Sequence, residues 1–330
     1  MKRKHRCFAL FSGGLDSMLA AKYMHDLGYE VRPIFFKTPF FGAAKAQKAA
    51  EIIGLDLIVH DLTEIYLPML RNPRYGFGKN MNPCIDCHGL MFRTAGELMD
   101  QYQVDFLISG EVLGQRPMSQ RRDAMNSVGK LSGKKDLLVR PLSQKLLSDT
   151  LPIRAGWVQK EEMLDIQGRG RYRQIELAEK MGISDFEMPG GGCLLTDVGY
   201  GKKLADLYAH QMLELKYINL LPAGRHFRIS PTLKLIVGKD ENDNAALSQL
   251  SSDQTMLLLK DYAGPLAVIQ ATQDLTADEM QICANILLRY SNKAPHTAQV
   301  EIGKNHRFDT IITAHKMANS QVEEYIINKG

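Results

Sequence analysis

Residues 10–19 read LFSGGLDSML, and this stretch decides the fold of the N-terminal part of the chain. The apolar run that ends at Phe11 is typical of a buried strand, and the residues after Gly14 have helical spacing. Ser12, Gly13 and Gly14 form a tight turn between the two. A glycine turn before a helix directs backbone N–H groups at one point, with the positive end of the helix dipole behind them. The stretch therefore predicts a phosphate site.

Three side chains of the turn bear on this phosphate site. Ser12 and Ser17 supply hydroxyl donors. Asp16 repels a phosphate unless a cation lies between them, so we interpret it as the partner of Mg²⁺ or of an ammonium group. The turn lacks both the lysine of GxxxxGK[ST] and the spacing of GxGxxG. An ordinary strand-to-helix turn with a capping serine is the alternative interpretation.

The first 180 residues alternate between strand-like and helix-like runs. This alternation predicts an α/β domain with a parallel, Rossmann-like sheet covered by helices on both faces. Ligands of such sheets bind at the carboxyl ends of the strands. We therefore expect residues 12–17, Lys37 and residues 110–115 to line one crevice, with Phe36 at the end of the second strand beside Lys37. The expected strands are 7–11, 31–36, 57–60 and 106–109, and the expected helices are 15–27, 43–53, 90–102, 161–166 and 173–181.

The texture of the sequence changes after Thr196, where we predict a smaller α+β domain. The domains are placed at residues 1–198 and 199–330. One long helix is expected over 202–220. Further helices are expected at 244–250 and 277–288, and strands at 227–229, 233–237, 255–259, 266–270, 298–302 and 307–312.

Bulk composition restricts the class of protein. A chain of 330 residues with 45% hydrophobic and 24% charged residues fits a two-domain globular protein. No apolar run reaches the roughly 18 residues of a membrane span. The basic N-terminus is followed by an apolar stretch, as in a signal peptide, but this stretch ends at Ser12 and no small-residue cleavage site follows it. We therefore expect a cytoplasmic protein with no membrane partner, and a net charge of +4 does not by itself indicate nucleic acid.

The chain has five cysteines, and an odd count in a cytosolic chain argues against a structural disulfide framework. Cys7 and Cys283 lie in apolar patterns and are expected to be buried core thiols. Cys84 and Cys87 form a CxxC pair that we place just before a helix, a position that favours the thiolate. Cys193 follows three glycines, so the backbone there can bend toward the CxxC pair.

Three thiolates without a fourth cysteine leave several chemistries open. One is a [4Fe–4S] cluster with one open iron, held by Cys84, Cys87 and Cys193. A second is persulfide chemistry, in which one cysteine carries sulfur and another resolves it. Zinc is a third, with His88 completing a Cys₃His set. Inert thiols are the fourth.

Several segments together resemble a known family. SGGLDS at 12–17 resembles the pyrophosphatase loop of the ATP-pyrophosphatase (PP-loop) superfamily, whose sheet is adenine nucleotide alpha hydrolase-like. With the CxxC pair, GEVLGQ at 110–115, SQ at 119–120 and VRPL at 139–142, roughly residues 5–196 resemble the catalytic domain of the tRNA 4-thiouridine synthases and their 2-thiouridylase relatives. No THUMP-like or rhodanese-like module is recognisable beside it.

The resemblance implies ATP-dependent tRNA thiolation, in which a uridine carbonyl oxygen is adenylated, pyrophosphate leaves and sulfur displaces AMP. It implies Asp16, Ser17, Cys84 and Cys193 as catalytic residues. The implied cofactors are ATP, Mg²⁺ and a [4Fe–4S] cluster, with zinc as the alternative. The implied partners are tRNA and either sulfide or a sulfur-donor protein, and a homodimer is left open. The residues implied to bind ATP are Ser12, Gly13, Gly14, Asp16, Ser17, Phe36, Lys37, Gly110 and Gln115, and the cluster ligands are Cys84, Cys87 and Cys193.

Two further regions suggest contact with RNA. HFRIS at 226–230 and LIVGKD at 235–240 resemble the RNA-binding NFACT-R domain of ribosome quality-control factors, although a generic hairpin followed by a helix is the alternative. A basic segment follows the 110–115 strand end. We interpret it as a flexible loop that contacts RNA phosphates, with a merely solvated loop as the alternative. The residues expected to bind RNA are Arg116, Arg121, Arg122, Lys134 and Arg171, and Tyr172 is expected to stack on an unpaired base.

Two other functions stay open at this point. The chain is alternatively a PP-loop ligase or amidotransferase that activates a small molecule. It is alternatively a non-catalytic RNA-binding factor with a degenerate nucleotide pocket, an interpretation that the intact Asp16 and Ser17 disfavour.

Overall fold

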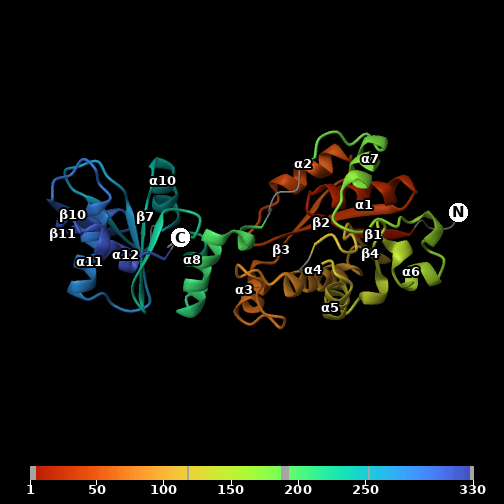
Figure 1. Cartoon of the computed structure of the whole chain (residues 1–330), viewed down its shortest axis with the longest axis horizontal. Helices are drawn as coiled ribbons and strands as arrows, with labels where there is room; N and C mark the ends of the chain where they lie inside the picture. Colours follow the sequence, from red (N-terminus) through yellow and green to blue (C-terminus); the bar gives the residue numbers. More distant parts are fainter. Residues whose placement is uncertain (1–4, 117–118, 187–192, 252, 328–330) are drawn as a thin grey trace. The chain divides into compact units, whose positions relative to one another are not determined.

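The computed structural model describes residues 5–116, 119–186, 193–251 and 253–327. The chain divides into two compact units, Met1–Leu194 and Leu195–Gly330. Figure 1 shows helices and strands in both units.

The N-terminal unit is built on a five-stranded parallel sheet of order β3-β2-β1-β4-β5. The strand order reverses between β1 and β4, and open α/β sheets bind ligands outside the carboxyl ends of their strands at such a point. This architecture confirms the predicted Rossmann-like α/β fold. The strands are β1 (Arg6–Leu10), β2 (Glu30–Lys37), β3 (Ile58–Asp61), β4 (Phe106–Ser109) and β5 (Leu138–Val139).

Helices cover both faces of this sheet (Figure 1). Because β1 has a helical layer on each side, Cys7, Phe8 and Ala9 are all buried and the strand is apolar throughout. On one face lie α1 (Leu15–Asp26), α2 (Ala44–Ile52) and α7 (Tyr172–Lys180), and on the other lie α3 (Thr63–Arg71), α4 (Cys84–Leu98) and α5 (Arg122–Ser132). The short helix α6 spans Leu151–Arg154.

The C-terminal unit holds a six-stranded antiparallel sheet of order β11-β10-β8-β9-β7-β6. With its helices it confirms the predicted α+β arrangement. The strands are β6 (Arg225–Ser230), β7 (Leu233–Val237), β8 (Thr255–Leu259), β9 (Ala267–Ala271), β10 (Thr297–Lys304) and β11 (Arg307–His315). The helices are α8 (Val198–Ala209), α9 (Leu215–Ile218), α10 (Glu241–Leu250), α11 (Ala277–Arg289) and α12 (Asn319–Tyr325).

Alternating side chains give this antiparallel sheet two apolar faces. Phe227, Leu235 and Cys283 belong to one buried cluster, and Ile236 and Val268 belong to another. Helix α11 begins with a capping box, because the Thr276 hydroxyl accepts from the Glu279 N–H while the Glu279 carboxylate accepts from the Thr276 N–H. In the described parts of the chain, no helix has the length and apolar character needed to cross a membrane.

Three predicted elements are wrong in their bounds. The long helix over 202–220 is two helices, because α8 ends at Ala209 and Gln211 takes a left-handed φ of 56° before α9 begins. The helix over 161–166 is a short 3₁₀ turn at Lys160–Glu162. Helix α4 begins at Cys84, so the CxxC pair lies in its first turn and not before it.

Helix α5 corrects a further expectation. The basic segment after Gln115 was predicted to be a flexible loop, but residues 122–132 form this helix. Its apolar residues Ala124, Met125 and Val128 are buried, which gives the segment a packed face. Helices α3 and α12 were not predicted either.

Candidate active site

The loop after β1 has the geometry of an anion site. Gly13 has a φ of +78°, and a Cβ there would lie 2.8 Å from the Ala46 Cα, so only glycine fits. Gly14 is the N-cap of α1 and offers no side-chain acceptor to the first-turn N–H groups. The Ser12 and Ser17 hydroxyl oxygens are 3.3 Å apart, and the Ser17 hydroxyl donates to the Gly14 carbonyl at 2.8 Å. The uncapped helix N-terminus is therefore available to a phosphate.

Gly110 brings the loop after β4 against this turn. A Cβ at Gly110 would lie 2.3 Å from the Asp16 carbonyl oxygen and 2.6 Å from the Ser17 nitrogen. Both are backbone atoms, so no rotamer change relieves the overlap. The absence of a side chain at Gly110 is what allows the two loops to touch.

Asp16 ends a chain of side-chain amides. The Gln115 amide nitrogen donates to Asp16 Oδ2 at 2.7 Å, and the Gln174 amide nitrogen donates to Gln115 Oε1 at 3.1 Å. Gln174 is fully buried on α7. Each amide fixes the orientation of the next, so α7 aims the Gln115 donor at Asp16. Arg171 Nη2 lies 3.4 Å from the same Asp16 oxygen.

The environment of Asp16 suits a bound cation. Burial raises its pKa, and the positive charge of Arg171 and the hydrogen bond from Gln115 oppose this effect. Its Oδ1 atom is buried and has no hydrogen-bond partner among the described residues. A carboxylate oxygen in this state is a hard oxygen ligand of the kind that Mg²⁺ takes, so the side chain fits the predicted role.

Two of the predicted ATP-binding residues contact the neighbouring strand in the structure. Phe36 is buried and its ring packs edge-on against His60 on β3, with centroids 5.9 Å apart. Lys37 lies at the carboxyl end of β2, where its ammonium group is 3.4 Å from the Asp61 carboxylate. Gly110 and Gln115 touch the Asp16 turn directly, whereas the described contacts of Phe36 and Lys37 are with β3.

A buried carboxylate connects the β4 end with the CxxC helix. Glu111 accepts from Arg140 Nε at 2.8 Å and lies 3.3 Å from His88 Nδ1. Ser109 Oγ, at the end of β4, donates to it at 3.3 Å. Burial alone would raise the pKa of Glu111, but Arg140 and His88 outweigh burial and hold it at about 2. Through His88, the residue after Cys87, this ionised carboxylate holds α4 in position.

The three cysteines of interest act on one another electrostatically. Burial raises the pKa of Cys87 to about 12, the Tyr66 hydroxyl opposes this, and the charges of Cys193 and Cys84 add to the rise. Cys84 and Cys193 are half-buried. The Asn82 amide donates to Cys84 Sγ at 3.1 Å.

Their donor chemistry fits a thiolate-bound metal group. Because Cys87 is protonated when nothing positive lies beside it, a metal cation would be what stabilises its thiolate. Within residues 5–116, 119–186, 193–251 and 253–327, no three His, Cys, Asp or Glu side chains converge as metal ligands. The glycines 190–192 that precede Cys193 lie outside the described residues.

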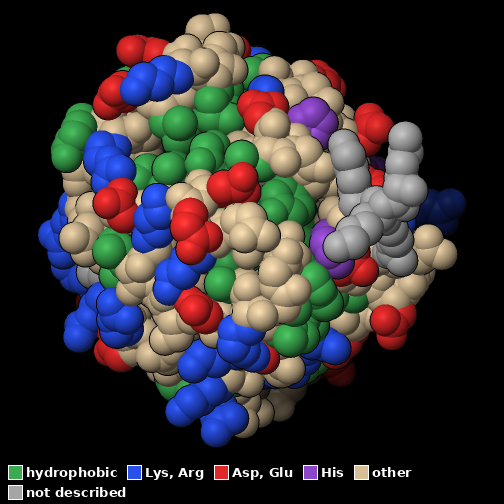
Figure 2. All heavy atoms as spheres, turned by 90° about the vertical axis from the view of Figure 1, so that its right-hand side faces the viewer, with side chains coloured by type: hydrophobic (Ala, Val, Ile, Leu, Met, Phe, Trp, Pro, Cys, Tyr) green, Lys and Arg blue, Asp and Glu red, His purple; other side chains and the backbone are tan. Residues whose placement is uncertain are grey.

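The predicted RNA-binding residues have differing surroundings. Arg116 is exposed, and its positive charge acts to lower the pKa of Asp16. Arg121 occupies the N-cap position of α5 and its side chain pairs with Asp123. Arg122 donates to the Leu146 carbonyl, and the Lys134 stem packs over Gly96 of α4. On the face shown in Figure 2, Lys and Arg side chains gather along the lower edge, with acidic side chains interspersed above them.

Two segments of the chain match the models of known protein families. Residues 3–144 match the family model of the thiamine biosynthesis protein ThiI. This ThiI match contains β1 to β5, the Asp16 turn and the CxxC pair. Residues 224–326 match the model of the NFACT protein RNA binding domain. Both predicted resemblances are therefore confirmed.

Curated relatives of the chain are thiolation enzymes by name. The chain is 33% identical over 112 residues to the tRNA-specific 2-thiouridylase MnmA of Sulfurimonas denitrificans. The aligned segment covers 31% of this chain and 33% of that protein. The chain is 30% identical over 105 residues to MnmA of Campylobacter concisus, covering 28% and 30%. The chain thus spans about a third of the length of these relatives.

Two solved structures are similar at a low level. A 4-thiouridine synthetase–RNA complex with bound ATP is 17% identical, with a TM-score of 0.35, covering 54% of this chain and 52% of that one. A predicted subunit of tRNA methyltransferase from Methanocaldococcus jannaschii is 20% identical, with a TM-score of 0.31, covering 41% and 68%. At these scores the likeness adds nothing to the fold described above.

Sequence reasoning missed two groups of this site. Gln174 lies on the buried face of α7 one turn before Ala178, so a polar residue at a core position was the available signal. Glu111 and Arg140 lie in the GEVLGQ and VRPL segments, but no pattern in the sequence pairs residues 29 positions apart.

The contact at Gly110 predicts a costly substitution. Gly110→Ala should lower the free energy of unfolding by about 1–3 kcal/mol, because its methyl group overlaps immovable backbone. Urea unfolding measures this. Gly42→Ala is the control, since nothing lies within 4 Å of a Cβ there. Equal stability of the two variants would contradict the close approach.

The Glu111–Arg140 pair predicts a pH-dependent loss of stability. Arg140→Met should cost about 3–5 kcal/mol at pH 7, because it removes the guanidinium from a buried carboxylate and leaves only His88 and Ser109 beside it. In the wild-type protein, the lowered pKa means that ionised Glu111 contributes to stability. This contribution is present above the unfolded-state pKa of about 4.5 and is lost as the pH falls toward the folded-state pKa of about 2. The cost of Arg140→Met should therefore shrink below pH 4.5, where the variant's carboxyl is protonated.

Urea unfolding at pH 7 and pH 4 measures this difference. Arg154→Met is the matched control, because Arg154 pairs with Asp136 on the exposed surface and its loss should change little. A cost for Arg140→Met that is the same at both pH values would contradict the assignment.

Proposed function

We propose that the chain is an ATP-dependent tRNA sulfurtransferase that replaces a uridine carbonyl oxygen with sulfur. The observation that carries the proposal is the SGGLDS turn at the switch point of a parallel sheet, within the segment that matches ThiI. The MnmA relatives, which are named as tRNA 2-thiouridylases, support the same chemistry.

The Asp16 turn performs the ATP step in this proposal. The N-terminus of α1 holds the phosphates, with the Ser12 hydroxyl beside them. The uridine oxygen attacks the α-phosphorus, the bond from this phosphorus to the bridging oxygen breaks, and pyrophosphate leaves. Asp16 would hold Mg²⁺, which supplies charge neutralisation for the departing pyrophosphate. Arg171 is a second cation at the same carboxylate.

The second step needs a sulfur nucleophile. Hydrosulfide adds to the activated carbon and gives its proton to solvent, the carbon–oxygen bond breaks, and AMP leaves. Cys84, Cys87 and Cys193 would hold a [4Fe–4S] cluster, which supplies a binding site for inorganic sulfide. Zinc on the same cysteines is the alternative metal.

Exposed groups near the site supply contacts for tRNA. Arg116 carries positive charge beside the Asp16 turn, and the Tyr172 ring is 74% exposed at the start of α7. Positive charge suits phosphates, and an exposed ring suits an unpaired base. The NFACT match supports a second RNA-binding surface in the C-terminal unit.

Asp16→Asn tests the ATP step. With ATP, sulfide and tRNA under strict anaerobiosis, it should reduce pyrophosphate release at least about 100-fold, because it removes a charged group at the reacting phosphates. Asp26→Asn, at the exposed end of the same helix, should keep full activity.

Mass spectrometry of nucleosides from the same reactions measures thiouridine. Wild-type protein that forms neither AMP nor thiouridine would overturn the proposal. Exchange of pyrophosphate into ATP without any RNA would favour a small-molecule acceptor instead.

Metal content tests the sulfur site. Protein purified without oxygen should contain about four irons and four acid-labile sulfides per chain. Cys193→Ala should lose this iron, whereas Cys283→Ala, a buried core substitution in the C-terminal unit, should keep it. Stoichiometric zinc would exclude the cluster, and no metal in either protein would leave persulfide chemistry.

A further inference from the structure

Gln174 is a fully buried polar side chain on the core face of α7. Its amide nitrogen donates to Gln115 Oε1 at 3.1 Å, and Gln115 donates onward to Asp16. The Oε1 atom of Gln174 is buried and has no hydrogen-bond partner among the described residues. The amide therefore makes a bond at one end and leaves an acceptor empty at the other, so the fold gains little free energy from it.

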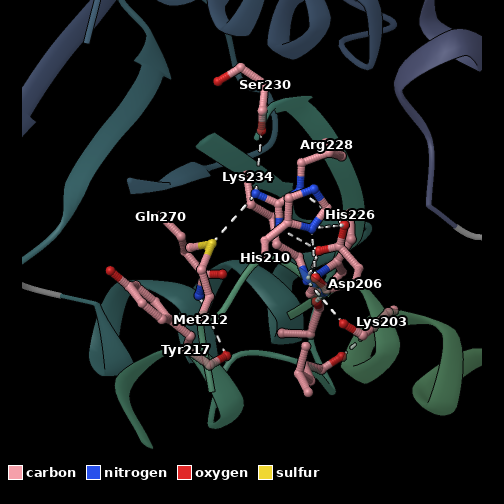
Figure 3. Close-up of polar contacts among 12 residues, drawn as sticks. Lys203, Asp206, His210, Met212, Tyr217, His226, Arg228, Ser230, Lys234 and Gln270 are labelled. Carbon is pink, nitrogen blue, oxygen red and sulfur yellow. Dashed lines mark hydrogen bonds and ion pairs between the residues drawn. The ribbon is translucent and has the colours of Figure 1, made fainter. Parts of the chain in front are cut away.

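An empty amide oxygen alone does not mark a functional side chain. In the C-terminal unit, Gln270 is fully buried, its amide nitrogen lies 3.5 Å from the Tyr217 carbonyl, and its Oε1 has no partner in the described part of the chain (Figure 3). Its neighbour across β7 and β9 is Lys234, whose ammonium group lies 3.2 Å from Asp206 Oδ2. The Gln270 amide thus ends at a backbone carbonyl, whereas the chain that begins at Gln174 ends at a carboxylate of the candidate active site.

The charge of Asp16 fixes the direction of the amide chain. An ionised carboxylate accepts hydrogen bonds only, so Gln115 has to present its nitrogen to Asp16. The oxygen of the same amide then faces Gln174, which has to present its nitrogen in turn. A rotated Gln115 amide would place its oxygen against an oxygen of Asp16. Gln174 is therefore the group that holds Gln115 in the one orientation that donates to Asp16.

The carboxylate at the end of this chain lies in the turn that holds the ATP phosphates in the proposed function. Gln115 donates to Asp16 Oδ2 at 2.7 Å, which fixes the rotation of the carboxylate about its own axis. Burial raises the pKa of Asp16, and the nearby charges of Arg171 and Arg116 and the two amides act against this rise. Both glutamines therefore act on the same carboxylate, one directly and one from the core.

We propose that Gln174 is a positioning residue of the ATP step, which acts on Asp16 through Gln115. Because Gln174 is fully buried, it reaches neither the nucleotide nor a metal ion itself. Its contribution is that the Asp16 carboxylate is already oriented when ATP binds, so the transition state needs no further reorganisation there. This role rests on the ATP step of the proposed function and not on its sulfur chemistry.

Gln174→Met tests this role, because methionine keeps the length of the side chain and removes the amide. With ATP, sulfide and tRNA, its kcat for pyrophosphate release should fall about 10- to 100-fold, the cost of a misplaced group at the reacting phosphates. Its KM for ATP should stay within about threefold of the wild-type value, because the α1 N-terminus and Ser12 are unchanged. Its unfolding temperature should stay equal, because the empty oxygen of Gln174 is lost and Gln115 Oε1 becomes empty instead.

Gln144→Met is the matched control, since Gln144 is a buried glutamine of the same unit whose amide is paired at both ends. It accepts from the Arg140 backbone N–H at 2.9 Å and donates to the Ser148 carbonyl at 3.0 Å. This control should lower the unfolding temperature and keep the kcat of the folded protein. A Gln174→Met variant that behaves in the same way, or one that keeps its kcat, would overturn the positioning role.

A double variant shows whether Gln174 acts through Gln115. Gln115→Met should lose at least as much kcat as Gln174→Met, because it removes the donor to Asp16 itself. The variant that carries both changes should lose no more than Gln115→Met alone, since neither amide contributes without the other. Losses that multiply in the double variant would overturn the assignment.

Side-chain amide NMR gives a readout that needs no ATP, metal or RNA. The Gln115 signal is identified by its absence from Gln115→Met. In Gln174→Met, exchange of this N–H with solvent should become about 10-fold faster, because nothing holds the amide against Asp16. Unchanged exchange overturns the positioning role even if the wild type forms thiouridine. Faster exchange supports it even if no thiouridine forms, an outcome that contradicts the proposed function alone.

Discussion

The approach of Gly110 to the backbone of Asp16 is the constraint on which the candidate site depends. The loops after β1 and β4 leave the sheet on either side of the switch point, and glycine alone allows them to touch. That contact places Gln115 within 2.7 Å of Asp16. Gln174 then joins α7 to the same carboxylate. Helix α7, whose Gln174 stands 158 positions after Asp16, is thereby coupled to the first turn of the fold.

The buried carboxylate of Glu111 and the half-buried carboxylate of Asp16 are affected in opposite ways by their surroundings. Glu111 has Arg140 at hydrogen-bond distance, and the pair overcomes the cost of burial, so this carboxylate is ionised. Asp16 has its cation at 3.4 Å and one oxygen without a partner, so burial dominates and raises its pKa. The first arrangement is complete in the protein alone. The second is incomplete, which is the property expected of a side chain that meets a ligand.

The local parts of this structure were predictable from the sequence. A strand, a glycine turn and a helix are adjacent in residues 10–19, and their chemistry depends on neighbours a few positions away. The alternation of strand-like and helix-like runs predicted the parallel sheet for the same reason, because each run is a local pattern. The break between α8 and α9 was not predictable, because the apolar spacing continues through Gln211 while the backbone turns left-handed there.

Long-range partners were also beyond a single sequence. Glu111 pairs with Arg140 and Gln115 with Gln174 because the fold brings them together, and nothing local marks the pairing. The basic segment was interpreted as a loop from its charges, whereas burial of Met125 and Val128 makes it the helix α5. The placement of Lys234 beside Gln270 is visible only once the register of β7 and β9 is known.

The two core cysteines give each unit its own chemical reporter. Cys7 is completely buried in the core of the N-terminal unit, and Cys283 is completely buried in a core of the C-terminal unit. Burial raises the pKa of both thiols, so neither reacts with an alkylating reagent until its core opens. The time course of Cys7 alkylation therefore reports when the N-terminal unit opens, and the time course of Cys283 alkylation reports when the C-terminal unit opens. A single mass spectrum of the labelled chain distinguishes concerted unfolding from the loss of one unit before the other.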